Sequence, residues 1–165
     1  MLAKNEISHR RFALAVVANL EVALTITQHL IRSDLEPQII SIIGQEANFA
    51  GERHSAIELA RILSRSAKIP ALMVDSNEII SLGRDTHALP KAIARNSEAF
   101  GGMLLRWLPS EHAERLISAV ACGEFLLLIE LHSMAEERIA TRTLLRNCRG
   151  SVEVHDFDTT EELRL

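Results

Sequence analysis

The sequence contains the same order of segments twice. Residues 11–44 and 124–157 each begin with an apolar run, pass through a polar capping residue into a stretch of helix length, and end, after a break, in a second apolar run. Each copy therefore predicts a strand, a helix and a second strand. Because the crossover helix makes the two strands of a unit parallel, two units in one chain leave few ways for four strands to share a sheet.

Capping signals predict where the helix of each copy begins. Asn19 precedes a helical pattern that we expect to stop near Ser33. In the second copy, Ser133 and Glu136 have the spacing of a capping box, and the helix should run to about Cys148. The four expected strands cover residues 11–17, 38–43, 125–132 and 151–156.

Two such units in succession predict an α+β fold of the ferredoxin-like kind. We expect a four-stranded antiparallel sheet in the order 4-1-3-2 with both helices on one face. The 165 residues should form a single domain. Its parts are the unit at 11–44, a mainly helical insertion at 45–123, the unit at 124–157 and a short acidic tail at 158–165.

The insertion carries its own helix signals. Ser55 and Glu58 have capping-box spacing and should begin a helix. Its inward face would consist of Ala56, Leu59, Ala60 and Leu63. The other expected elements are a short strand at 71–74, a short helix at 75–83, a helix at 91–108, and an amphipathic helix capped by Ser110.

Composition argues against several classes of protein. A net charge of -4, an aromatic content of 4% and the absence of Tyr disfavour a nucleic-acid binder. The apolar runs are shorter than the roughly 18 residues that a membrane helix needs, so no transmembrane segment is expected. Cys122 and Cys148 are the two cysteines, and we expect two buried thiols in a reducing, cytoplasmic compartment.

The predicted topology leaves one sheet face open. Phe125, Leu127, Ile129 and Leu131 would face the helices, and Leu126, Leu128, Glu130 and His132 would face away. We expect Leu126 and Leu128 to form an apolar patch with Ala13 and Ala15 of the first strand. A soluble monomer rarely exposes such a patch, so we expect the insertion and a second subunit to share in covering it. The alternative is that the strand faces are assigned the wrong way round.

Histidines at one edge of the predicted sheet form a candidate metal site. The strand order places His9, His132 and His155 at the same edge, with Glu130 and Asp156 nearby. The alternative is three solvated histidines at the ends of strands. Glu111, His112 and Glu114 begin a predicted helix, where carboxylates complement the helix dipole, so we assign them no site.

No catalytic motif is present: there is no G-x-S-x-G, no Walker loop and no dinucleotide fingerprint. We therefore expect a non-enzymatic protein without a cofactor that acts through protein contacts, as a homo-oligomer or as an accessory subunit. One alternative is a regulatory module that binds a small ligand between sheet and insertion. Another is an enzyme of the dimeric α+β barrel kind, for which Glu130, Glu153 and the edge histidines would supply the polar groups.

The order of elements also resembles that of a known family. LPSEHAERLISAVACGEFLLLIEL and HSMAEERIATRTLLRNCRGSVEVHDF form a proline-led helix, an apolar strand after Gly, a polar-capped helix and a V-x-V strand. With LEPQIISIIG in the first unit, this order is similar to bacterial general stress proteins of the heat-induced type. The resemblance implies a stress-related role but no catalytic residue, because that family has no established activity. Members with a Gly- and Ala-rich apolar stretch differ from this chain, which has only Gly101 and Gly102 there.

Overall fold

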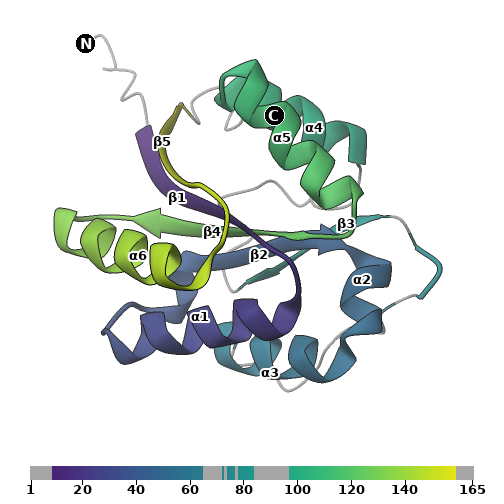
Figure 1. Ribbon diagram of the computed structural model, residues 1–165, viewed down its shortest axis with the longest axis horizontal. Coiled ribbons are helices and arrows are strands. Elements are labelled where there is room, and N and C mark those ends of the chain that lie inside the picture. Colours follow the sequence, from purple (N-terminus) through teal and green to yellow (C-terminus); the bar gives the residue numbers. More distant parts are fainter. Residues whose placement is uncertain (1–8, 65–71, 73, 77, 84–96, 159–165) are drawn as a thin grey trace, which may run out of the picture.

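Five strands form an antiparallel sheet that lies between two groups of helices (Figure 1). The computed structural model describes residues 9–64, 72, 74–76, 78–83 and 97–158. In chain order the elements are β1 (His9–Val17), α1 (Leu20–Arg32), a 3-10 turn (Pro37–Ile39), β2 (Ile40–Gln45), α2 (Glu46–Gly51), α3 (Arg53–Ser64), β3 (Ile79–Gly83), α4 (Ser97–Trp107), α5 (Ser110–Ala121), β4 (Phe125–Leu131), α6 (Met134–Asn147) and β5 (Val152–Asp158).

The sheet has the strand order β3-β2-β4-β1-β5. The prediction of four strands is therefore wrong, because β3 adds a fifth strand beside β2. The four predicted strands are β1, β2, β4 and β5, and among themselves they keep the predicted order 4-1-3-2. Residues 75–83 were expected to form a short helix, but Ile79–Gly83 pairs with β2 instead, with Ile43 opposite Ser81. Consecutive β-branched residues, Ile79 and Ile80, suit a strand better than a helix. The strand expected at 71–74 lies partly outside the described residues, and Val74 is in a turn.

Strand register decides which side chains share a face. In the antiparallel pair of β1 and β4, Ala13 lies opposite Ile129 and Leu14 lies opposite Leu128. Residues directly opposite each other point to the same side of a sheet. Ala13 and Ala15 therefore belong with Phe125, Leu127 and Ile129 in the core toward α1, α3 and α6.

Leu126 and Leu128 point the other way, as predicted. They lie with Phe12 and Leu14 in a second core that also contains Leu104 and Leu108, at the end of α4, and Leu116 of α5. The expected patch of Ala13, Ala15, Leu126 and Leu128 is thus split between the two faces. An error of one residue in the phase of β1 is enough to cause this, because strand side chains alternate.

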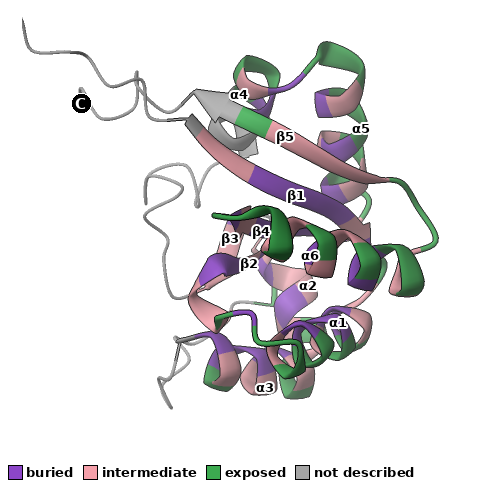
Figure 2. Ribbon diagram, turned by 90° about the vertical axis from the view of Figure 1, so that its left-hand side faces the viewer, coloured by how far each residue is buried: buried purple, intermediate pink, exposed green. Residues whose placement is uncertain are grey.

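Both faces of the sheet carry helices. The helices of the two repeated units, α1 and α6, lie on one face, as predicted, and α4 and α5 of the insertion cover the other. Figure 1 shows α4 and α5 on one side and α1, α3 and α6 on the other, and Figure 2 shows the buried middle of β1 between them. Relative exposure is 0% for Ala13 and Leu126, 1% for Ala15 and 3% for Leu128. The chain's own helices therefore cover all four residues that were predicted to form an interface.

Capping groups hold the helix starts in both repeated units. The Asn19 side chain accepts a hydrogen bond from the Val22 amide at 2.9 Å, as predicted. Ser133 accepts from the Glu136 amide, but the Glu136 carboxylate accepts from the His132 amide, one residue before the position that a capping box uses. Ser55 does not cap α3, since that helix already begins at Arg53.

The two cysteines are both free thiols. Cys122 is exposed, which corrects the prediction that both thiols are buried, and Cys148 is partly buried. Burial raises the pKa of the Cys148 thiol. Within the part of the chain that the structure describes, no helix combines the length and the apolar character that a membrane crossing requires.

Gly44 provides a test of the core beneath β2. A Cβ atom at this position would lie 2.5 Å from Cδ1 of Phe125 and 3.2 Å from Cε2 of Phe49. These two rings pack edge to face, with centroids 4.9 Å apart. We expect Gly44→Ala to lower the free energy of unfolding by about 1–3 kcal/mol through overpacking, measured by urea unfolding.

Gly51→Ala is the matched control, because a Cβ at Gly51 would have no neighbour within 4 Å. It should leave the free energy of unfolding nearly unchanged or slightly raised, since alanine favours the helix. Equal unfolding midpoints for Gly44→Ala and the unmodified protein would contradict the packing described for Phe49 and Phe125.

Candidate functional site

Glu153 is the centre of a polar cluster on the face of the sheet that α4 and α5 cover. It lies in β5, where it is opposite Leu14, and His155 is opposite Phe12. Since strand side chains alternate, Glu153 and His155 both point toward this face. The Glu153 side chain is 11% exposed and the His155 side chain 19%.

Helix α5 supplies the other members of the cluster. Ala113, Leu116 and Val120 are buried against the sheet. His112 and Arg115 precede two of these residues by one position, so they form an adjacent stripe on the same helix with Ala119. The packing of the apolar stripe thereby places His112 and Arg115 beside β5.

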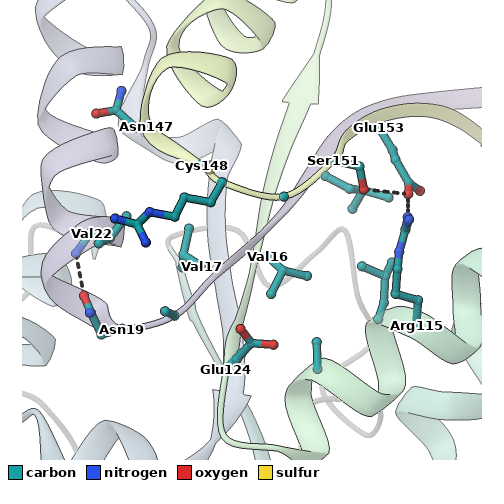
Figure 3. A pocket seen from close by; sticks show the side chains of 16 residues that line it. Val16, Val17, Asn19, Val22, Arg115, Glu124, Asn147, Cys148, Ser151 and Glu153 are labelled. Atoms are coloured by element: carbon teal, nitrogen blue, oxygen red, sulfur yellow. Dashed lines mark hydrogen bonds and ion pairs between the residues drawn. The ribbon is translucent and has the colours of Figure 1, made fainter.

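The side chains of His112, Arg115 and His155 all contact the Glu153 carboxylate. Nδ1 of His112 and Nε2 of His155 each lie 2.9 Å from its Oε2 atom. Arg115 forms an ion pair with the other oxygen, Oε1, and Figure 3 shows this contact beside the Ser151 hydroxyl. The two imidazole rings are 5.6 Å apart between centroids and nearly perpendicular. Oε2 of Glu153 therefore contacts the two histidines, and Oε1 contacts the guanidinium of Arg115.

The surroundings of His155 favour its neutral form. Burial lowers the pKa of its imidazole, and positive charge on His112 and Arg115 lowers it further, while Asp156 acts in the opposite direction. A neutral imidazole that contacts an ionised carboxylate through Nε2 must carry its proton on that nitrogen. In its neutral form, His155 therefore donates a hydrogen bond from Nε2 to Glu153.

The side chains of His112, Glu153 and His155 could also hold a metal ion. Among the described residues, the ligand atoms of His112, Glu153 and His155 all lie within 4.8 Å of one another. Two imidazoles and a carboxylate are ligands that zinc accepts. This trio differs from the predicted one of His9, His132 and His155, of which it contains only the last.

His132 lies in a separate cluster, because β1 runs between β4 and β5. Its side chain is 57% exposed, and its Nε2 atom lies 3.3 Å from Glu130. Arg10 binds both oxygens of that same Glu130 carboxylate at 2.8 and 2.7 Å. The side chain of His9 lies outside the described residues.

Asp156, which the prediction placed near the histidines, is held away from them. Its carboxylate pairs with Arg11 at 2.9 Å. Arg11 also pairs with Glu137 of α6, on the opposite side of the sheet. Arg11 holds the pKa of the Glu137 carboxyl below its ordinary value. These charges form a structural ion-pair group and add no ligand to the cluster around Glu153.

Sequence reasoning missed His112. It was explained as part of a polar helix start, and its partner Glu153 is 41 residues away in the chain. Two local patterns could have indicated the site: His112 and Arg115 are three residues apart on a helix, and Glu153 and His155 alternate on a strand. Only the packing of α5 over β5 brings the two pairs together.

A pocket of about 640 Å³ opens beside this cluster. It lies between the end of β1, the start of α1, helix α5 and the connection from α6 to β5 (Figure 3). Its apolar wall comprises Leu14, Val16, Val17, Val22, Leu116 and Ala119. Arg115 and Glu153 also line it, so the pocket and the histidine cluster share two residues.

The polar residues of the pocket fall into two groups. Asn19 caps α1, Asn147 donates to the Thr143 carbonyl, and Arg115 and Glu153 pair with each other. Glu124 and Arg149 differ, because neither side chain has a hydrogen bond or ion pair with any described residue. The pocket therefore offers one carboxylate and one guanidinium that are not used within the described fold.

No family model, no curated protein and no solved structure matches this chain.

The titration of His155 tests the electrostatics of the cluster. We expect its pKa, followed by histidine NMR in the presence of a chelator, to lie below about 6.5, the ordinary value. His112→Asn removes one repelling charge and should raise the pKa of His155, yet leave it below the ordinary value because burial is the largest cause. The exposed His132, changed to Asn, is the control and should have no effect.

The lowered pKa of His155 makes the stability of the fold depend on pH. The unfolded chain binds the His155 proton more readily than the folded one. The contribution of His155 to stability is therefore fully present above the pKa of the unfolded chain. It is lost as the pH falls from that value through the lower pKa of the folded protein. A His155 that titrates at or above its ordinary pKa would contradict the cluster described here.

Proposed function

We propose that the protein binds a small molecule in the pocket between the sheet and α5, as a ligand-binding regulatory module. The observation that supports this is the combination of an apolar wall with two charged side chains, Glu124 and Arg149, that have no partner among the described residues. Pockets that hold small molecules are mostly apolar and carry a few convergent polar groups that orient the ligand. A volume of about 640 Å³ lies within their usual range.

The charges favour a particular class of ligand. Arg115 and Glu153 neutralise each other, which leaves one free negative and one free positive group in the lining. Figure 3 shows Glu124 at the lower edge of the pocket, apart from Glu153. A ligand with an apolar body and both an amino and a carboxylate group would match these charges and the apolar wall. Free apolar amino acids are the simplest molecules of this kind.

Action through protein contacts on an open sheet face has less support. It was predicted from Ala13, Ala15, Leu126 and Leu128, which helices of the same chain cover. Association into a homo-oligomer, a stress-related role and a cytoplasmic location stay predictions. An enzymatic role would need the polar groups of an open face, and α5 already lies over Glu153 and His155.

Binding of L-phenylalanine and L-leucine to the full chain tests the proposal. We expect saturable heat by calorimetry and a raised Tm for these amino acids. Hydrocinnamate lacks the amino group and phenethylamine lacks the carboxylate, so both should bind more weakly than phenylalanine. If neither amino acid binds, or if the analogues bind equally well, the proposed ligand class is wrong.

Two pairs of variants locate the binding. Ala119→Leu fills the pocket from α5 and should weaken binding at least tenfold, whereas Ser118→Leu adds the same side chain on the exposed side and should not. Arg149→Gln removes the unpaired guanidinium and should cost about tenfold. Arg146→Gln on α6, outside the pocket, is its control. Equal losses in both members of a pair would place the ligand elsewhere.

A further inference from the structure

We propose that His112, Glu153 and His155 form a binding site for a divalent transition-metal ion, with zinc as the ion that they fit. The three ligand atoms come from two elements, α5 and β5, and lie within 4.8 Å of one another. The site does not depend on the proposed pocket ligand, because neither histidine lines the pocket.

Two of the three distances between ligand atoms are close to those that zinc requires. Ligand atoms at about 2.0–2.1 Å in a tetrahedron are about 3.3 Å from one another. The two nitrogens in the structure are each 2.9 Å from Glu153 Oε2, so these two edges need to lengthen by a few tenths of an ångström. Small side-chain rotations of His112 and His155 can supply this change, since neither imidazole belongs to the backbone hydrogen-bond ladder.

The ligand chemistry selects the class of ion. Imidazole nitrogens suit zinc, copper, nickel and iron, whereas magnesium and calcium prefer an all-oxygen set. Three protein ligands leave a fourth position for water, as in open zinc sites. His112 is 41% exposed, so this position can face solvent on the α5 side. Metal entry requires that His112 Nδ1 and His155 Nε2 carry no proton, so zinc binding either releases a proton from a ring or moves it to the other ring nitrogen.

The second oxygen of Glu153 is already held. Arg115 binds Oε1, and the Ser151 hydroxyl lies 3.5 Å from the same atom. Such outer partners orient a ligating carboxylate and leave its other oxygen for the ion. The positive charge of Arg115 also opposes a cation nearby, but the guanidinium is half-exposed and solvent screens it. Arg115 is therefore a positioning residue for Glu153.

Zinc binding to the full chain, freed of any polyhistidine tag, tests the site. We expect one zinc ion per chain by calorimetry and elemental analysis. Cobalt in its place should give the intense visible absorption of a tetrahedral complex. Because the ion joins α5 to β5, the Tm should rise by about 5–10 °C when free zinc exceeds the Kd about a hundredfold.

Single substitutions assign the ligands. His112→Asn, Glu153→Gln and His155→Asn should each weaken zinc binding at least tenfold. His132→Asn is the matched control, since His132 also lies beside two carboxylates, Glu130 and Glu136. Cys122→Ser controls for binding by the exposed thiol. Circular dichroism and the metal-free Tm of each variant show that a loss of binding is not a loss of folding.

The outcomes are distinct from those of the pocket. Ala119→Leu should keep zinc binding, and His112→Asn, measured in metal-free buffer, should keep amino acid binding. Absence of zinc and cobalt binding would overturn the metal site, as would binding that survives in His112→Asn and His155→Asn but is lost in His132→Asn or Cys122→Ser. Neither result would affect the proposal for the pocket.

Discussion

Burial of β1 and β4 on both of their faces is the constraint from which the rest of the structure follows. Consecutive residues in each strand, such as Phe12 with Ala13 and Leu128 with Ile129, are buried although they point in opposite directions. A sheet whose central strands are apolar on both sides has to be covered on both sides. Helices α1, α3 and α6 cover one side. The other needs α4 and α5, and this requirement brings α5 over β5 and creates the polar cluster.

The local elements were predictable where short-range chemistry decides them. Asn19 and the pattern after it predicted α1. In residues 125–131, the period of two along a strand placed Leu126 and Leu128 on the face opposite Leu127 and Ile129, and the structure confirms this. Ala13 and Ala15 of β1 were assigned to the wrong face of the sheet. Strand β1 carries apolar residues on both faces, so its sequence has no alternation of polar and apolar residues that would show which face each residue takes. The facing of β1 is determined only by its pairing with β4 and β5.

Strand β3, the fifth strand of the sheet, was not predicted for a related reason. Ile79–Gly83 is short and lies at the edge of the sheet, where it pairs only with β2 among the described strands. A five-residue segment has too few positions for period two to differ clearly from period 3.6. The candidate site was equally hidden, since His112 meets Glu153 through the packing of α5 and not through any local spacing.

Glu153 couples the two proposed sites, although neither site needs the other to be occupied. Its Oε2 atom faces the histidines, and its Oε1 atom holds Arg115, which lines the pocket. A cation bound at Oε2 would withdraw negative charge from the carboxylate and weaken its attraction for Arg115. The guanidinium would then be freer to attract a ligand carboxylate in the pocket, so the metal should strengthen binding of an anionic group there. Since linkage is reciprocal, an anionic ligand that engages Arg115 should strengthen metal binding by the same factor. The sign is set by charge alone, because Arg115 cannot neutralise Glu153 and the ligand equally well at once.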